Sequence, residues 1–245
     1  MSSDQPLVTL DSASKSFGTL NVLNQVNLTI PAGQLVVVLG SNGAGKTTLL
    51  RMIAGLLGLD SGKLKIAGER LNRLSEKQRE KIFYLPDFPA LFEEMTVLEN
   101  LEIWLTLYGR EQDHAEQELF ALLERFNLAE KARLPMLSLS RGQRFKVALS
   151  CYEGSQAPIA LLDEPFASGM DASGLKEMRT LLRKATADGR SVIYTTQLVS
   201  YALNFSDRIL LIHDQGIYFD GTPARFQQLL DEADPVLKYF SEDEE

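Results

Sequence analysis

The sequence predicts an α/β fold with a mostly parallel sheet at its core and an inserted helical subdomain. Three observations predict this fold: short apolar runs typical of strands, helical segments that alternate with them, and a helix-rich stretch in the middle of the chain. The 245 residues, 44% hydrophobic and 24% charged, suffice for one large core with a smaller subdomain. We therefore expect a single domain over residues 1–245, with the helical subdomain inserted at about 88–150.

The first strands are predicted by the spacing of apolar residues. Val8–Leu10 and Val26–Ile30 alternate apolar and polar positions, as half-buried strands do. Leu35–Leu39 is an uninterrupted apolar run, which is typical of a strand buried on both faces. A helix is expected from Lys46 onward.

The middle of the chain changes in character. From about Arg70 to Arg144, Glu, Gln, Lys, Arg and Leu dominate, and Val97–Tyr108 and Ala115–Phe126 have helical periodicity. We interpret this stretch as a helical insertion.

Strands and a helix alternate again in the last third of the chain. We expect strands at Ile159–Leu162, Ser191–Thr195, Arg208–His213 and Gly216–Phe219, and a helix at about Gly174–Asp188. This alternation indicates a mostly parallel sheet. The acidic end, Ser241–Glu245, is expected to be a solvated, frayed tail.

Composition argues against several classes of protein. The net charge of −8 and the pI near 5.0 give no sign of a basic face, so we expect no nucleic-acid partner. The single cysteine, Cys151, excludes an internal disulfide and is expected to fill a helix face; with only His114 and His213 beside it, a zinc site is not expected. The chain has neither an apolar run of about 20 residues nor a secretory start, so we expect it to stay in the cytoplasm.

A glycine-rich segment carries the strongest chemical signal. Its residues are Gly40, Ser41, Asn42, Gly43, Ala44, Gly45, Lys46 and Thr47, followed by Thr48. The segment matches G-x-x-x-x-G-K-[ST] between a buried strand and a helix, which is the phosphate loop of P-loop NTPases. In such a loop, backbone N–H groups face phosphate oxygens, Lys46 reaches the β- and γ-phosphates, and the Thr47 hydroxyl binds Mg²⁺. The sequence therefore predicts ATP and Mg²⁺ as cofactors, against the alternative of a turn that binds nothing.

Two carboxylates follow another buried strand. Asp163 and Glu164 come directly after Ile159–Leu162. At the carboxyl end of that strand, Asp163 would hold Mg²⁺, commonly through water, and Glu164 would polarise the attacking water. The alternative is that the carboxylates only open a turn, because Pro165 ends the strand.

The segment Leu139–Gln143 lies before these carboxylates and resembles the LSGGQ signature of the ATP-binding cassette ATPases. Residues 167–171 look like the D-loop of that family, and the resemblance extends from about residue 7 to residue 223. It implies a P-loop NTPase core of the RecA-like type with a mostly parallel sheet, an N-terminal antiparallel β subdomain and the helical subdomain inserted in the core.

The resemblance also implies a dimer. Two ATP molecules would lie between the phosphate loop of one subunit and Ser140, Gly142 and Gln143 of the other, with Phe17 stacked on adenine. Phe17 as an ordinary core residue is the alternative. The second subunit would be an identical or a different cassette, and the pair would sit peripherally on the cytoplasmic face of a membrane, on membrane-spanning transporter subunits.

Three positions depart from the family pattern. Asp87 stands where the family has a glutamine that touches Mg²⁺, and its carboxylate is an expected metal ligand. Gln197 replaces the switch histidine as the expected catalytic partner of Lys46 and Glu164, and an amide does not titrate near neutral pH. Arg141 replaces the first glycine of the signature, and we expect its side chain to point to solvent rather than contact phosphate or ribose. These departures predict slow ATP hydrolysis.

The segment Phe88–Phe92 is expected to line a groove for a helix of a membrane subunit, with a local core cluster as the alternative. Met95–Leu101 resembles the cassettes of exporters, so export is favoured.

The predicted function is thus a subunit that binds and hydrolyses ATP to energise transport. Two alternatives stay open: an ATP-dependent regulatory or assembly module with weak hydrolysis, and a soluble cassette ATPase without a transport role.

Overall fold

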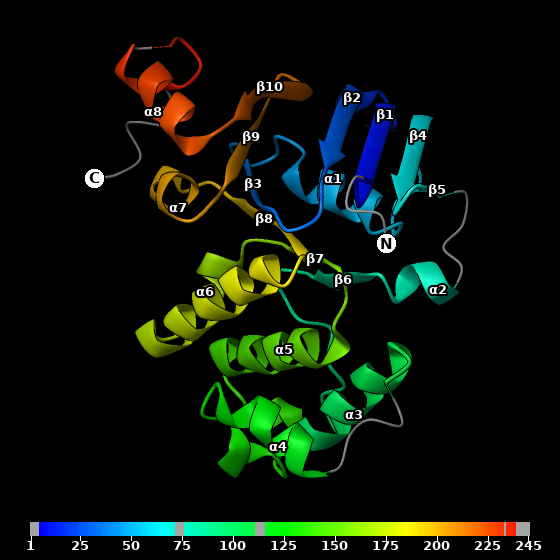
Figure 1. The fold of residues 1–245 in the computed structure, drawn as a ribbon, viewed down its shortest axis with the longest axis vertical. Coiled ribbons are helices and arrows are strands. Elements are labelled where there is room, and N and C mark those ends of the chain that lie inside the picture. The colour runs from blue at the N-terminus through cyan, green and yellow to red at the C-terminus, as the bar shows by residue number, and fades with distance from the viewer. Residues whose placement is uncertain (1–4, 72–75, 111–115, 233, 239–245) are drawn as a thin grey trace.

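The structure is a computed structural model that describes residues 5–71, 76–110, 116–232 and 234–238. His114 and the expected acidic tail, residues 241–245, lie outside the described residues. Figure 1 shows three parts: an antiparallel sheet near the N-terminus, a second sheet that crosses the middle of the molecule, and a group of helices below it.

The N-terminal sheet is antiparallel, as predicted, and has the order β2-β1-β4-β5. Its strands are β1 (Val8–Phe17), β2 (Leu20–Ile30), β4 (Ser61–Ile66) and β5 (Glu69–Arg70). β1 pairs with β2 and β4, so that Val8 lies opposite both Ile30 and Ile66. All three side chains are completely buried, and the alternating apolar positions of these strands therefore cover one side of the core.

The second sheet has six strands in the order β10-β9-β3-β8-β7-β6. Its strands are β3 (Leu35–Leu39), β6 (Ile82–Leu85), β7 (Ile159–Leu162), β8 (Ser191–Thr196), β9 (Arg208–His213) and β10 (Gly216–Gly221). Every neighbouring pair is parallel except β9 with β10. The carboxyl ends of β3, β8, β7 and β6 therefore meet along one edge of the sheet.

Helices surround this sheet. The α-helices are α1 (Lys46–Ile53), α2 (Glu76–Arg79), α3 (Val97–Leu107), α4 (Glu116–Glu124), α5 (Arg141–Ser155), α6 (Ala172–Ala187), α7 (Val199–Asn204) and α8 (Pro223–Asp231), and the 3₁₀ helices are η1 (Ala129–Lys131), η2 (Met136–Ser138) and η3 (Pro165–Ala167). One expectation needs correction: Arg70–Arg144 is not helical throughout, because β6 lies within it as the edge strand of the six-stranded sheet. Four apolar and aromatic residues in a row, Ile82–Leu85, fit a strand packed on both faces.

The two faces of the six-stranded sheet are buried in two separate cores. Leu35, Val37 and Leu39 face the core formed with α3, α5 and α6, whereas Val36 and Val38 face the core formed with α1 and the antiparallel sheet. Because successive side chains of a strand point to opposite faces, an uninterrupted apolar run is what a strand between two cores requires. Cys151 is a fully buried part of the first core.

Two capping boxes fix where the inserted helices begin. Thr96 and Glu99 cap α3, and Ser140 and Gln143 cap α5, each through reciprocal side-chain and backbone hydrogen bonds. At the start of α5, a Cβ on Gly142 would lie 2.3 Å from the carbonyl oxygen of Gly169. Only glycine permits this close approach, so the first turn of α5 packs directly on the backbone of the loop at 168–171. Within the described ranges, no helix is long and apolar enough to cross a membrane.

Candidate active site

The phosphate loop lies at the carboxyl end of β3 and leads directly into α1. Gly43 and Gly45 have φ values of 81° and 108°, which favour glycine, and they turn the backbone so that α1 begins at Lys46. Lys46 is only 6% exposed. Its amine donates hydrogen bonds to the carbonyl oxygens of Gly40 at 2.7 Å and Ser41 at 3.3 Å. The loop thus brings a buried cation and the free N–H groups of a helix start to one point, which suits a polyphosphate.

Asp163 lies at the end of β7 and faces this loop. Its carboxylate oxygen Oδ1 accepts hydrogen bonds from the hydroxyls of Thr47 at 3.0 Å and Thr195 at 2.7 Å, and the residue is only 4% exposed. A hydroxyl and a carboxylate that converge in this way are hard oxygen donors of the kind that Mg²⁺ prefers. The residues present therefore fit a magnesium ion.

Glu164 is the next residue, and its backbone is constrained. It has a φ of 47°, a left-handed conformation that is uncommon for glutamate, and its N–H donates to the Thr195 hydroxyl at 2.8 Å. The carboxylate lies 3.3 Å from the Lys46 amine. Burial raises the pKa of Glu164 above its ordinary value; Lys46 opposes this shift, and the charges of Asp163 and Asp87 add to it. A carboxylate with a raised pKa, held beside a phosphate site, is suited to accept a proton.

Thr195 is a site residue that sequence reasoning did not identify. It is fully buried, and its hydroxyl connects Asp163 with the N–H of Glu164. The sequence contains one signal for this role, because Thr195 ends the predicted strand Ser191–Thr195. Polar residues at the carboxyl ends of parallel strands lie along the same edge of the sheet. The order of the strands, which puts β8 between β3 and β7, was needed to use that signal.

Asp87 and Arg141, two of the positions that depart from the family pattern, contact each other in the structure. The carboxylate of Asp87, the expected metal ligand, forms an ion pair with the Arg141 guanidinium. The Arg141 side chain is 41% exposed, in agreement with the expectation that it points to solvent. Its guanidinium also pairs with Asp87 and lies over the ring of Phe88, 4.4 Å from the ring centroid, which was not expected. Phe88 and Phe92 are 68% and 48% exposed, so they do not form a local core cluster.

The other predicted residues lie around the phosphate loop or on α5. Phe17 ends β1 and is 50% exposed, which does not fit the alternative of a core residue. Gln197 is exposed immediately after β8. Ser140 and Gln143 cap α5, as described above, with Ser140 exposed and Gly142 buried. The exposed His213 ends β9, where its ring contacts that of Tyr218.

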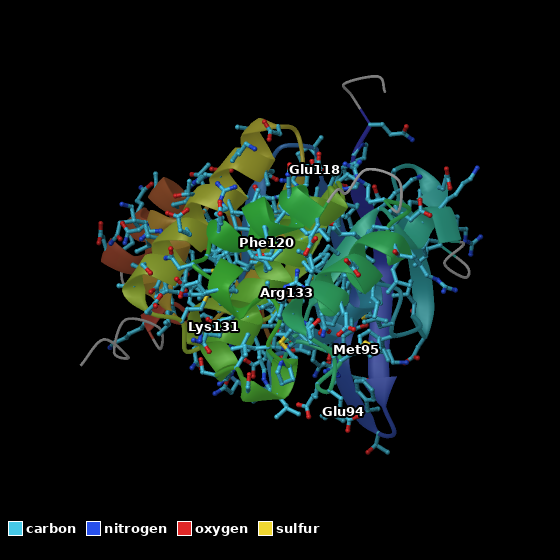
Figure 2. All side chains as sticks on the ribbon, turned by 90° about the horizontal axis from the view of Figure 1, so that it is seen from below. Glu94, Met95, Glu118, Phe120, Lys131 and Arg133 are labelled. Carbon is cyan, nitrogen blue, oxygen red and sulfur yellow. The ribbon has the colours of Figure 1, made fainter. Side chains whose placement is uncertain are left out.

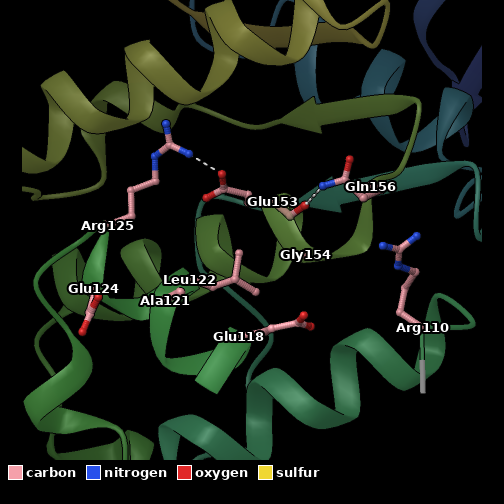
Figure 3. A pocket seen from close by; sticks show the side chains of 9 residues that line it. All are labelled: Arg110, Glu118, Ala121, Leu122, Glu124, Arg125, Glu153, Gly154 and Gln156. Atoms are coloured by element: carbon pink, nitrogen blue, oxygen red, sulfur yellow. Dashed lines mark hydrogen bonds and ion pairs between the residues drawn. The ribbon is translucent and has the colours of Figure 1, made fainter. Parts of the chain in front are cut away.

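Two hollows lie away from the phosphate loop. The larger, about 1160 Å³, runs between the end of α1, β6 and α3, and its lining includes Leu56, Leu85, Leu91, Trp104 and Leu107. The smaller, about 590 Å³, lies between α4 and α5 (Figure 3). Arg125 crosses the smaller one toward Glu153, and its lining mixes both signs of charge. Neither hollow includes a residue of the phosphate loop.

The fold and site together define a class: a P-loop ATP-binding domain of α/β type, with an antiparallel sheet at one side and a helical insertion. Residues 23–167 match the family model for the ABC transporter. The chain therefore belongs to the ABC transporter family, as one of its ATP-binding domains.

Known proteins of this family are similar over most of the chain. The sulfate/thiosulfate import ATP-binding protein CysA of Yersinia pestis is 37% identical over 221 residues, which are 88% of this chain and 60% of that protein. The chain thus spans less than two thirds of the length of this relative. A solved ATP-binding subunit of an ABC transporter superposes with a TM-score of 0.87 at 26% identity, over 96% of this chain and 100% of that one. A dimeric ATP-binding cassette in a post-hydrolysis state, bound to ADP and Pi, gives a TM-score of 0.78 at 27% identity over 88% and 98%.

Proposed function

We propose that this chain binds Mg-ATP and hydrolyses it to energise transport through separate membrane-spanning subunits. The observation that carries the proposal is the convergence of Lys46, Thr47, Asp163 and Glu164 at the carboxyl edge of the sheet. Lys46 and the start of α1 would bind the phosphates, while Thr47 and Asp163 would hold the metal. Magnesium would neutralise charge on the β- and γ-phosphates. Glu164 would accept a proton from the attacking water, and Phe17 would stack on the adenine.

Comparison of the wild type with Glu164→Gln tests hydrolysis. The variant keeps the size of the side chain and removes the proton acceptor, so we expect it to bind Mg-ATP normally and to lose at least about 100-fold in turnover. Binding is measured with a fluorescent nucleotide and turnover by phosphate release. Equal turnover in the two proteins would contradict the role of Glu164. The three departures from the family pattern predict that the wild type hydrolyses ATP more slowly than a typical family member. Turnover of hundreds per second, well above the median enzyme rate of about 10 per second, would contradict this prediction.

We also propose a head-to-tail dimer around two ATP molecules. In the first turn of α5, Ser140 is exposed and its hydroxyl caps the Gln143 N–H. The N–H groups of Arg141 and Gly142 at this helix start would donate to the γ-phosphate of a nucleotide on a second subunit. The dimeric cassette with ADP and Pi that superposes on this chain supports this arrangement. A second copy of this chain or a different cassette would complete it.

The larger hollow is our candidate for the membrane-subunit contact. Its lining is mainly apolar, Leu56 and Leu107 at its rim are 64% and 62% exposed, and the indole N–H of Trp104 is buried without an acceptor among the described residues. An apolar floor with an unmet donor suits a short amphipathic helix. Pro89, Ala90 and Leu91, from the middle of the segment that we expected to line such a groove, belong to this lining, whereas Phe88 and Phe92 do not.

Leu107→Glu tests the groove. A charge on its rim should release the chain from membranes that contain its transporter, because the desolvated carboxylate opposes docking, while Mg-ATP binding stays normal. Leu134→Glu is the matched control, since Leu134 is 43% exposed and lies outside the lining. The measurement is co-sedimentation of each variant with membrane vesicles prepared from the host cells of this protein. If Leu107→Glu co-sediments with the vesicles as the wild type does, the groove is not the contact site for the membrane subunit.

The chain would act on the cytoplasmic face of the membrane as a peripheral subunit. Export remains a prediction from Met95–Leu101, and CysA of Yersinia pestis, by its name, serves import. No contact in the described structure favours the regulatory module or the soluble, non-transport ATPase over transport.

A further inference from the structure

Arg141 and Asp87 are 54 positions apart in the sequence, yet their side chains form an ion pair. Arg141 lies in the first turn of α5, and Asp87 lies two residues after β6. The same guanidinium covers the ring of Phe88 at 4.4 Å and approaches the Asp87 carbonyl oxygen at 3.5 Å. The Arg141 side chain therefore contacts both the carboxylate and the backbone carbonyl of Asp87, as well as the ring of Phe88.

A second arginine ties the same helical turn to the same segment. Arg144 donates to the Glu93 carboxylate at 2.7 Å and to the carbonyl oxygens of Leu137 and Leu139, each at 3.1 Å. The first turn of α5 is thus fixed at two points to the segment 87–93, so Arg141 approaches Asp87 from an ordered backbone.

Asp87 lies at the same edge of the sheet as the proposed magnesium and nucleotide site. β6 and β7 are parallel neighbours in which Leu85 lies opposite Leu162, and the N–H of Asp163 donates to the Leu85 carbonyl at 2.9 Å. Asp87 lies two residues after Leu85, and Glu164 lies two residues after Leu162, so both follow the same pair of neighbouring positions. The negative charge of Asp87 also contributes to the raised pKa of Glu164, after burial and Asp163. An unpaired carboxylate at this place would repel a polyphosphate.

We propose that Arg141 is a positioning residue that acts through Asp87: it holds the carboxylate of Asp87 at the first turn of α5 and neutralises a charge that would otherwise weaken nucleotide binding. The proposal rests on the nucleotide site proposed above. It also gives one physical reason for two departures from the family pattern, because an acidic residue after β6 is tolerated when a cation replaces the first glycine of the signature.

The alternative is that Arg141 contacts a phosphate directly. The two roles predict different behaviour when Asp87 is neutralised. If Arg141 acts through Asp87, its loss matters only while Asp87 is charged. If it binds phosphate, its loss is harmful whichever residue occupies position 87.

The test titrates the full chain with magnesium and a non-hydrolysable ATP analogue, which requires no turnover. We expect Arg141→Gln to weaken binding about tenfold and the double variant Asp87→Asn/Arg141→Gln to bind within about twofold of Asp87→Asn alone. The defect of Arg141→Gln should shrink at about 1 M salt, where the Debye length is about 3 Å.

Arg133→Gln is the matched control. Arg133 also forms an exposed ion pair, with Glu116 at 2.7 Å, and it lies over the helical face of the molecule (Figure 2). This variant should bind the analogue like the wild type, because neither member of its pair belongs to the nucleotide site.

Two results would overturn the proposal: wild-type affinity in Arg141→Gln, or a double variant that binds as weakly as Arg141→Gln. A third result would overturn the nucleotide site together with it. If Lys46→Ala binds the analogue as tightly as the wild type, the phosphate loop is not where the nucleotide binds. The Lys46→Ala measurement therefore separates failure of the proposed function from failure of the Arg141 role.

Discussion

Lys146 is a nearly buried cation whose amine contacts the Asp171 carboxylate. The amine donates to both carboxylate oxygens of Asp171, at 2.9 and 3.1 Å, and Asp171 also caps α6 through the N–H of Gly174 at 2.7 Å. These contacts, that of Lys146 first, lower the pKa of Asp171 from its ordinary 3.8 to about 2. One aspartate therefore both begins a helix and neutralises a lysine of the helix that carries the signature.

This pair predicts a pH-dependent stability difference between the wild type and Asp171→Asn. Asparagine keeps the helix cap but loses the charge, so we expect a loss of about 1 kcal/mol at pH 6, a modest value because the Asp171 side chain is 65% exposed. A carboxyl group with a lowered pKa stabilises the fold above its unfolded pKa. The contribution of Asp171 to the free energy of unfolding falls as the pH decreases below 3.8 and is lost as the pH passes about 2. The difference in unfolding free energy between the wild type and Asp171→Asn should therefore narrow over that pH range.

Urea unfolding at several pH values measures this difference. Asp188→Asn, at the other end of α6, is the control, because an acidic residue at a helix C-terminus is not stabilising and its replacement should cost nothing. A difference for Asp171→Asn that stays constant from pH 6 to pH 2 would contradict the role of the charge.

At the scale of elements, the close contact between α5 and the loop at 168–171 depends on the absence of a side chain at Gly142. A Cβ there would lie 2.3 Å from the Gly169 carbonyl oxygen and 2.8 Å from its carbonyl carbon, and backbone atoms cannot move aside alone. We expect Gly142→Ala to cost about 1–3 kcal/mol in the free energy of unfolding. Hydrolysis should fall more steeply than stability, since the displaced turn carries Ser140.

Gly154→Ala is the matched control, because it makes the same change in the same helix. Its Cβ would meet Leu105 Cδ2 at 2.5 Å and Leu122 Cδ1 at 2.9 Å, which are the ends of flexible side chains. Leucine rotamers can adjust, so its cost should be smaller and its turnover close to that of the wild type. Chemical denaturation and phosphate release measure both effects. Equal losses in the two variants would show that the backbone contact at Gly169 has no special role.

The elements also show what local sequence can predict. The bounds of β3, β7 and β9 agree with the expected strands because each is an apolar run between polar residues. The strands β4 and β5 and the helices α7 and α8 were not predicted. α8 begins with Pro223 after a Thr222 cap, a signal that the sequence does contain. The phosphate loop was predictable because neighbouring residues form it. The contact between Arg141 and Asp87 was not, because only the packing of α5 beside β6 brings the two together.

At the scale of the whole molecule, the proposed site is formed by segments that no local interaction holds together. The phosphate loop follows β3, the carboxylates follow β7, and Thr195 lies on β8 between them, so the order of the strands alone brings them together. Figure 1 shows the helical group, with α5, on the other side of β7 and β6 from α1. A nucleotide that contacts the loop and the carboxylates would therefore connect separate parts of the chain.

This arrangement predicts that Mg-ATP stabilises the protein and drives its association. We use Glu164→Gln, so that ATP is not consumed. At a nucleotide concentration about 100 times the dissociation constant, binding contributes about 2.7 kcal/mol, which corresponds to a rise in Tm of roughly 5–10 °C. If two chains enclose the nucleotides, the rise should grow with protein concentration, and sedimentation should show a dimer only with Mg-ATP. Lys46→Ala should show neither effect. A rise in Tm that is independent of protein concentration, with a monomer throughout, would mean that this chain needs a different cassette to complete its site.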